Sequence, residues 1–126
     1  MRILVADDAG FIRAILCKVY EDAGHQIVGE ATTGPEAIAL AMTTRPDIAI
    51  IDLVLPELNG LEVAAEISKH SPALTLIALS SLDQPWIADK VKQAGFSDFI
   101  RKPFTKEDVL SVLELVYLPK KEIKHG

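Results

Sequence analysis

The segment Ile48-Ala49-Ile50-Ile51-Asp52 decides the fold, because it is a short apolar run that ends in a carboxylate. Three other short apolar runs are each followed directly by a polar or charged side chain. Asp7 and Asp8 follow residues 1–6, Ser80 follows residues 74–79, and Lys102 follows residues 99–101. Short apolar runs separated by helical patterns are typical of a parallel sheet with helices on both faces. Ligands of such sheets bind beyond the carboxyl ends of the strands, so we expect these five groups to meet at one edge.

The rest of the chain predicts five strands alternating with five helices. We expect strands at 2–6, 25–31, 48–51, 74–79 and about 98–101. Helices are expected between 11 and 24, 34 and 46, 61 and 71, 83 and 95, and 105 and about 118. Asp83-Gln84-Pro85 reads as the cap and first turn of the fourth helix, and Thr105 as the cap of the fifth. Right-handed crossovers then leave only a few doubly wound α/β sheets.

Composition narrows the class of protein. A chain of 126 residues, 49% hydrophobic, fits one domain with a substantial core, which we place at 1–118 with a short polar tail at 119–126. The net charge of −5 argues against nucleic-acid binding. No apolar run approaches the roughly 18–20 residues of a membrane span, so a cytoplasmic location is expected. Cys17, the single cysteine, cannot form an internal disulfide and is expected to pack as a small hydrophobe.

The carboxylates at the predicted edge call for a cation. Three of them would repel each other strongly, and hard oxygen ligands suit Mg²⁺. We expect Asp8 and Asp52 to be direct ligands, Asp7 to act directly or through water, and the backbone carbonyl of Val54 to add another oxygen. A metal there would lower the negative charge that an incoming phosphate meets.

The same edge has the groups needed for phosphoryl transfer. A carboxylate such as Asp52 can attack phosphorus to give an acyl phosphate. The three equatorial oxygens of the transferred group need separate stabilisers, here Mg²⁺, the Ser80 hydroxyl and the Lys102 ammonium. Taken singly, Asp7 is as often a turn former, whereas Ser80 is more often a loop hydroxyl and Lys102 more often a solvated charge. Complementary groups at four separate strand ends favour a shared site.

With those residues placed, the chain resembles the receiver domain of two-component response regulators. The resemblance is carried by residues 3–8, 52–60, 77–81 and 99–104 and extends over about 1–118. The stand-alone, chemotaxis-type regulators are the most similar. The resemblance implies a five-stranded flavodoxin-like sheet in the order 2-1-3-4-5. It also implies that Asp52 accepts a phosphoryl group from the phosphohistidine of a sensor histidine kinase, and that Asp7 and Asp8 hold Mg²⁺.

Further roles are also implied by the resemblance. Ser80 matches the switch hydroxyl, Lys102 the lysine that contacts the phosphoryl group, and Phe99 the aromatic switch position; a cis peptide bond is implied before Pro103. The phosphoryl group would attract Ser80, Phe99 would turn inward, and the face made by the fourth helix, fifth strand and fifth helix would change shape. We expect Trp86 and Arg101 on that face. The alternatives are a static core aromatic at Phe99, half-buried packing at Trp86 and a solvated Arg101.

Some positions depart from the commonest receiver pattern. Ser80 stands where threonine is more usual, and Ser81 where alanine or glycine is common. Val54 and Leu82 are apolar where several fast-dephosphorylating relatives have polar groups. These two positions flank the path of an attacking water, so we hypothesise a long-lived acyl phosphate, lost over minutes or longer.

The sequence therefore predicts a phosphorylation-controlled binding switch that is a phosphoacceptor and not an enzyme. It would act on a downstream partner protein, without nucleic acid or membrane, and as a monomer. One alternative is a phosphorelay intermediate or phosphate sink. Another is a flavin binder, which the negative charge of Asp7 and Asp8 disfavours. A receiver cut from a longer regulator is the remaining alternative.

Overall fold

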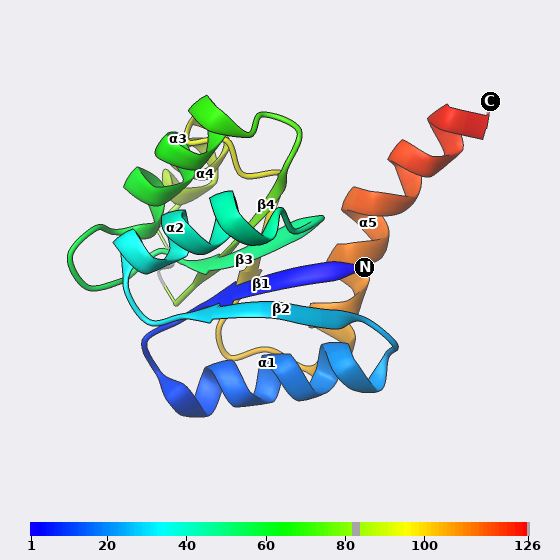
Figure 1. The fold of residues 1–126 in the computed structure, drawn as a ribbon, viewed down its shortest axis with the longest axis horizontal. Coiled ribbons are helices and arrows are strands. Elements are labelled where there is room, and N and C mark those ends of the chain that lie inside the picture. The colour runs from blue at the N-terminus through cyan, green and yellow to red at the C-terminus, as the bar shows by residue number, and fades with distance from the viewer. Residues whose placement is uncertain (82–83, 126) are drawn as a thin grey trace.

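The computed structural model describes the backbone of residues 1–81 and 84–125, and the side chains of these residues as far as Val116 (Figure 1). Strands and helices alternate along the chain. The strands are β1 (Arg2–Ala6), β2 (Gln26–Ala31), β3 (Ile48–Asp52), β4 (Thr75–Ser80) and β5 (Asp98–Arg101). The helices are α1 (Gly10–Asp22), α2 (Gly34–Thr44), α3 (Gly60–His70), α4 (Ile87–Gln93) and α5 (Lys106–His125).

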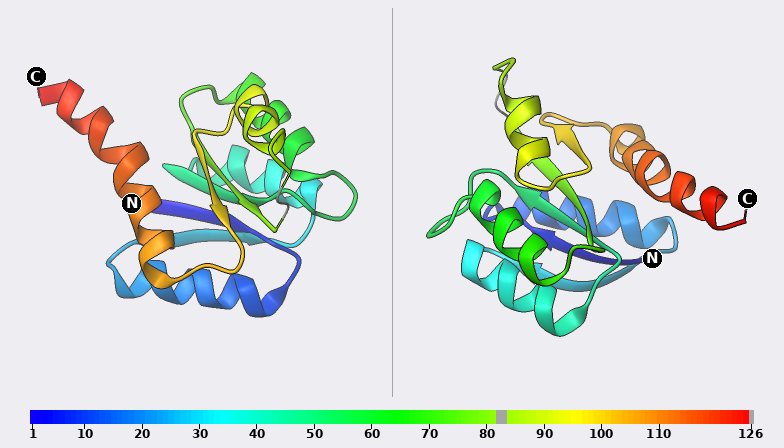
Figure 2. Two further views of the ribbon diagram at one scale, coloured as in Figure 1. Left: turned by 180° about the vertical axis from the view of Figure 1, so that it is seen from behind. Right: turned by 90° about the horizontal axis from the view of Figure 1, so that it is seen from above.

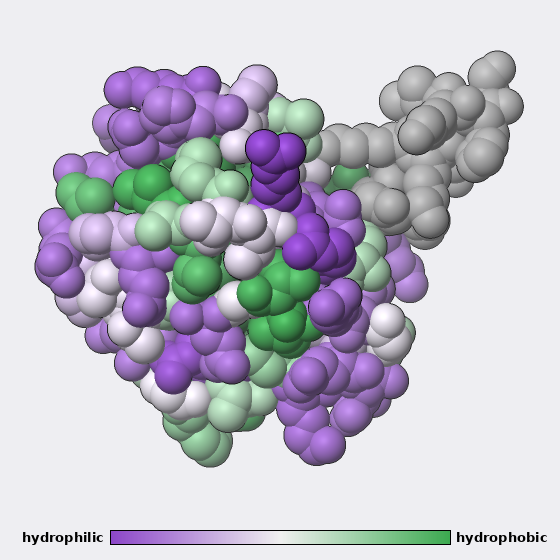
Figure 3. Space-filling view, in the orientation of Figure 1, coloured by the Kyte–Doolittle hydropathy of each residue, from purple (hydrophilic) through white to green (hydrophobic). Residues whose placement is uncertain are grey.

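The strands form one parallel sheet in the order β2-β1-β3-β4-β5. The predicted flavodoxin-like order is thus confirmed. Helices α1 and α5 cover one face of the sheet and α2, α3 and α4 cover the other (Figures 1 and 2). On the face seen in Figure 3, the main hydrophobic patches lie across the middle of the view, among mostly hydrophilic surroundings.

The two core clusters explain why the strands read as apolar runs. Leu4 and Ala6 point into the cluster beneath α2 and α3, while Ile3 and Val5 point into the cluster beneath α1 and α5. Every residue of β3 and β4 is buried. A strand buried on both faces needs apolar side chains at successive positions, so alternation disappears. The sheet is therefore a rigid platform whose carboxyl ends hold the polar groups.

Two helix boundaries differ from the prediction. Helix α4 begins at Ile87 and not at the predicted cap of residues 83–85, because Trp86 occupies the N-cap with helical backbone angles and no side-chain hydrogen bond. The predicted cap residue Asp83 lies outside the described residues, as does Leu82. Helix α5 continues past Leu118 to His125, through the residues predicted to be a tail. Pro119 removes one backbone donor, but the lysines and glutamate that follow favour helix.

Within the described part of the chain, no helix is both long and apolar enough to cross a bilayer.

Candidate functional site

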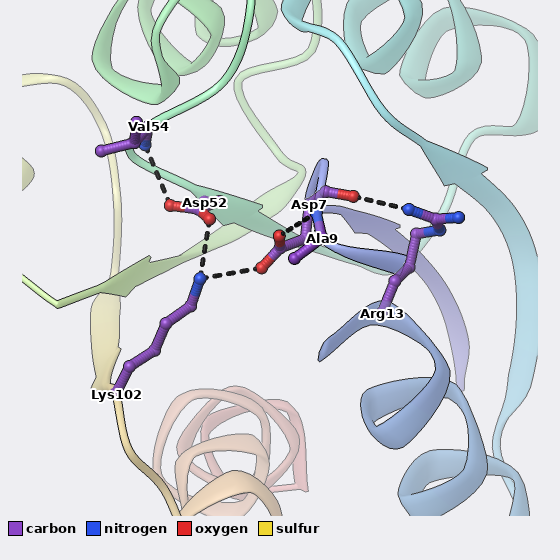
Figure 4. A network of polar contacts seen from close by, with 6 residues as sticks. All are labelled: Asp7, Ala9, Arg13, Asp52, Val54 and Lys102. Carbon is purple, nitrogen blue, oxygen red and sulfur yellow. Dashed lines mark hydrogen bonds and ion pairs between the residues drawn. The ribbon is translucent and has the colours of Figure 1, made fainter. Parts of the chain in front are cut away.

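The polar groups predicted at the strand ends lie at the carboxyl edge of the sheet. Figure 4 shows three of them, Asp7, Asp52 and Lys102, pointing toward one another. Asp7 follows β1, Asp52 is the last residue of β3, Ser80 is the last residue of β4, and Lys102 follows β5. Asp7 is fully buried and Asp52 is only 6% exposed. Burying two carboxylates costs free energy unless both are paired with hydrogen-bond donors or positive charges. The partners of Asp7 and Asp52 therefore decide the chemistry available at this edge.

Lys102 bridges the two buried carboxylates. Its Nζ donates to Asp7 Oδ2 at 2.9 Å and to Asp52 Oδ2 at 2.7 Å (Figure 4). The other carboxylate oxygens accept backbone bonds, Asp7 Oδ1 from Ala9 N at 2.8 Å and Asp52 Oδ1 from Val54 N at 2.9 Å. Each buried carboxylate is thereby fixed in orientation through both of its oxygens. Charge-assisted bonds of this kind are short and strong.

Burial and charge act in opposite directions on the pKa values of this pair. Burial raises the pKa of Asp52 above its usual value, and the hydrogen bond from Lys102 offsets only part of the increase. For Lys102, burial works to lower the pKa, but the hydrogen bonds to Asp52 and Asp7 leave it raised. The site therefore keeps a firmly protonated lysine beside a carboxylate whose charge is poorly solvated. Such a carboxylate gains from any further positive charge.

The carboxylates also fit a metal ion. One oxygen from each of Asp7, Asp8 and Asp52 lies within 4.8 Å of the other two. Magnesium prefers oxygen ligands at about 2.0–2.1 Å in an octahedron, and ligands around one ion are then about 3–4 Å apart. Asp8 is exposed, which leaves its side of the cluster open to water ligands. The donor set and its spacing therefore fit Mg²⁺.

A close backbone approach fixes the position of Asp52. A Cβ atom at Gly60 would lie 2.4 Å from the backbone oxygen of Asp52, so no larger residue fits there without moving the strand end. Gly60 N also donates to Leu53 O at 2.9 Å. In the sequence, Asn59-Gly60 predicted only a turn; the contact with the strand that ends in Asp52 depends on how α3 packs and was missed.

The remaining candidate residues lie on β4, α4 and β5. Ser80 is buried, and its carbonyl accepts from Lys102 N at 2.8 Å, which ties the two strand ends together. Phe99 is partly buried against the cluster beneath α2 and α3, to which Ile87 and Val91 of α4 also belong. Trp86 is 52% exposed, and Arg101 is exposed at the end of β5. The peptide bond between Lys102 and Pro103 is cis, as the resemblance implies.

Two other expectations concern residues beside the site. Val54, whose N–H bonds to Asp52, is 61% exposed. Cys17 is buried within the cluster beneath α1 and α5, in agreement with its predicted packing role. Sequence reasoning missed Arg13, which donates to the Asp7 carbonyl and to Glu30. The available signal was a charged residue between Ile12 and Ile15 in an apolar helical pattern.

The fold and the site together define a doubly wound α/β domain with an acidic pocket bridged by a lysine. Residues 3–114 match the family described as the response regulator receiver domain. The chain belongs to this family, and it is a receiver-type phosphorylation switch whose acidic pocket contains Asp7, Asp8 and Asp52. Receiver domains are phosphoacceptors and not conventional enzymes.

Individual relatives agree with this assignment. The chain is 37% identical to a chemotaxis protein CheY from Thermotoga maritima, over 91% of this chain and 96% of that protein. It is 33% identical to the transcriptional regulatory protein PdtaR from Mycobacterium tuberculosis, over 97% of this chain but 59% of that longer protein. Among solved structures, the chemotaxis protein CheY4 from Vibrio cholerae matches with a TM-score of 0.84 and 28% identity, covering 91% of this chain and 97% of that one.

Proposed function

We propose that Asp52 accepts a phosphoryl group from the phosphohistidine of a sensor histidine kinase, and that α4, β5 and α5 then present a changed face to a partner protein. One observation carries the proposal: the Lys102 Nζ lies between Asp7 and Asp52 at hydrogen-bond distance from both. That arrangement leaves the acceptor carboxylate oriented and beside a positive charge before any phosphodonor arrives.

The transfer step follows from the groups at the strand ends. A carboxylate oxygen of Asp52 forms a bond to phosphorus while the P–N bond of the donor breaks and its electron pair returns to the imidazole nitrogen. Lys102 exchanges its bond to Asp52 for one to a phosphoryl oxygen and remains bonded to Asp7. Preorganised charge of this kind stabilises the negative charge that the transferred group carries.

Mg²⁺ would be held by Asp7, Asp8, Asp52 and the carbonyl of Val54, and when bound it supplies positive charge for a phosphoryl oxygen. Support for this set comes from the close spacing of the three carboxylates. The Val54 N–H donates to Asp52 Oδ1 at 2.9 Å, which keeps the backbone of Val54 close to the proposed acceptor.

The switch is proposed to pass through Ser80 and Phe99. Ser80 is buried at the end of β4, and in the β4–β5 pairing it lies opposite Arg101, while Ala78 lies opposite Phe99. A pull on the Ser80 hydroxyl by the phosphoryl group therefore acts on the strand beside Phe99. Trp86 and Arg101, both exposed, are the residues proposed to contact the partner; exposed aromatics and arginines commonly dominate such contacts.

The acyl phosphate is proposed to be long-lived, because Val54 is exposed and apolar at a position where several fast-dephosphorylating relatives have polar groups. A lifetime of minutes or longer suits a switch. Loss within seconds from the isolated protein would reject this part of the proposal and favour a phosphate sink.

The acceptor is tested by incubating the protein with acetyl phosphate and Mg²⁺ and measuring intact mass. We expect the wild type to gain one phosphoryl group and Asp52→Asn to gain none. Asp22→Asn, which changes an exposed aspartate of α1 that pairs with Lys18, is the matched control and should gain the group normally. Equal gains in wild type and Asp52→Asn would place the acceptor elsewhere.

A further inference from the structure

We infer that Arg13 is a positioning residue of the acidic pocket: anchored by Glu30, it holds the backbone of Asp7 and so sets where Asp7 and Asp8 lie relative to Asp52. The inference rests on the proposed function of the pocket, and it assigns a role to a basic residue that bonds to none of the carboxylate oxygens that would hold the metal.

This turn has no capping side chain. Ala9 occupies the N-cap of α1 in an extended conformation, with φ −80° and ψ 105°, and makes no side-chain cap hydrogen bond. Alanine is among the poorest N-cap residues, and replacing a good cap with it costs about 1 kcal/mol. The residues between β1 and α1 include Asp8, a candidate metal ligand. Their geometry must therefore be held by something other than the helix cap.

Arg13 supplies the missing constraint from one turn into α1. Its Nη1 donates to the Asp7 carbonyl at 2.8 Å (Figure 4). Its Nε donates to Glu30 Oε1 at 3.0 Å. The Asp7 N–H donates to Ala31 O at 3.0 Å. Both backbone polar groups of Asp7 are therefore bonded, one to β2 and one to the guanidinium. On the other side of the same residue, the side chain is bonded to Lys102 and Ala9.

Glu30 orients the guanidinium. It belongs to β2, which pairs with β1, so its backbone is fixed relative to the strand that carries Asp7. The Arg13 side chain is 20% exposed and that of Glu30 is 51% exposed. The planar guanidinium places two donors in a fixed geometry, one toward a carbonyl and one toward a carboxylate. Lysine, with a single ammonium on a flexible stem, cannot reproduce this arrangement.

The sign of the effect on metal binding separates positioning from simple electrostatics. Arg13 is positively charged and lies beside an acidic pocket, so its field alone opposes binding of Mg²⁺. If the charge were all that mattered, removing it would tighten Mg²⁺ binding. If positioning dominates, removal frees the turn and weakens binding. Groups that orient metal ligands from outside commonly change affinity by about 10–100-fold when mutated.

The test is calorimetric titration of the purified protein with MgCl₂, without any phosphodonor. We expect Arg13→Met to weaken Mg²⁺ binding by about tenfold. Arg13→Lys, which keeps the charge, should also bind more weakly than the wild type. Lys18→Met is the matched control, because it removes a positive charge from the same helix at an exposed ion pair, and it should leave the affinity unchanged. Circular dichroism melts of each variant check that it is folded.

Variants of Glu30 test whether this residue acts through Arg13. Glu30→Gln should weaken Mg²⁺ binding less than Arg13→Met, and the double variant should bind no more weakly than Arg13→Met alone, because the two residues act as one unit. Unchanged or tighter binding in folded Arg13→Met or Arg13→Lys would overturn the inference. Failure of the wild type itself to bind Mg²⁺ would instead count against the proposed metal site, so the two failures are distinguishable.

Discussion

The acidic pocket and the face made by α4 and β5 are built in opposite ways. In the pocket, Asp7 and Asp52 each accept a bond from Lys102 and another from the backbone, and both are buried. Helix α4 has only seven residues, and in the described part of the chain its N-cap residue Trp86 makes no side-chain cap hydrogen bond. Apolar packing of Ile87 and Val91 holds this helix, while Trp86 is half-exposed and Phe99 only partly buried. The acidic pocket is thus held by a closed set of polar contacts, whereas the face made by α4 and β5 is held by the packing of a few apolar side chains.

Helices α3 and α4 show the same contrast within one layer. Helix α3 begins with a capping box, in which Asn59 Oδ1 accepts from Glu62 N at 2.9 Å and Glu62 Oε1 accepts from Asn59 N at 3.2 Å. Its first residue, Gly60, packs directly against the end of β3. Among the described residues, the start of α4 shows neither device. The helix next to Asp52 is therefore held at its start by a capping box and a close backbone contact, and no such contacts are described for the helix on the proposed output face.

The largest expected effect comes from breaking the pocket at Lys102. Lys102→Met should slow phosphorylation by acetyl phosphate by about 100-fold, because the transferred group loses a preorganised positive charge. Mg²⁺ binding should not weaken, since a competing cation has been removed from Asp7 and Asp52. Intact mass against time gives the rate, and calorimetry gives the affinity. Lys69→Met, at the far end of α3, is the control. A normal rate in Lys102→Met would contradict the account.

A smaller effect is expected when the acceptor's charge is removed. Asp52→Asn should raise the free energy of unfolding by about 1 kcal/mol at pH 7 in the presence of a chelator, because a buried and repelled negative charge is lost. The sign follows from the raised pKa of Asp52 in the folded protein, which is caused mainly by burial. A raised carboxyl pKa means that ionisation destabilises the fold, so wild-type stability falls as pH rises from the unfolded value of 3.8 through the higher native one.

The pH dependence provides the check on that prediction. Urea denaturation of wild type and Asp52→Asn should differ most at neutral pH, and the difference should shrink as pH falls and the wild-type carboxyl takes up its proton. Adding Mg²⁺ should stabilise the wild type by mass action. A variant less stable than wild type at neutral pH without metal would show that the Lys102 bridge outweighs burial.

The contribution of the capping box to the stability of α3 is tested by removing it. Asn59→Ala removes the acceptor of the capping box and should lower the free energy of unfolding by about 1 kcal/mol. Asn59→Asp keeps a capping oxygen and is the matched control, expected to change stability little. Chemical denaturation measures both. Equal stability of Asn59→Ala and the wild type would show that the capping box does not hold the start of α3.

The smallest expected effect concerns the reactivity of Cys17, which packs in the cluster beneath α1 and α5. Burial, with Glu30 nearby, raises the pKa of the Cys17 thiol to about 11. At pH 8 only about one thiol in a thousand is then ionised, so modification by a thiol reagent should be slow. The rate should rise about tenfold per pH unit between pH 8 and 10. Glu30→Gln should speed the reaction. Rapid, pH-independent modification of the native protein would show that α1 is loosely packed.

The sheet and its edge were predictable because they depend on short-range patterns. Each strand of the core is a run of apolar residues, and Asp7, Asp52, Ser80 and Lys102 follow directly from where those runs end. The two wrong boundaries lie where local patterns pointed elsewhere. Asp83-Gln84-Pro85 predicted an earlier start for α4 than Ile87, and α5 continues to His125 through a proline that normally ends helices.

What the sequence did not show are contacts between distant segments. Gly60 and the end of β3 meet because α3 packs onto the sheet, and nothing in Asn59-Gly60 beyond a turn indicates it. Arg13 and Glu30 lie on different elements and are joined only once β2 has paired with β1. Local patterns predict where polar groups emerge from a sheet, whereas their supporting contacts depend on tertiary packing.

Hydrogen exchange measured by mass spectrometry tests most directly whether phosphorylation in the acidic pocket changes the face made by α4 and β5. The protein is compared with and without phosphorylation by acetyl phosphate and Mg²⁺, with Asp52→Asn treated in the same way as a control. We predict changed protection in residues 84–101, which include α4 and β5, and little change in β1, α1 and β3. Changes confined to the pocket strands, or identical changes in Asp52→Asn, would contradict the account.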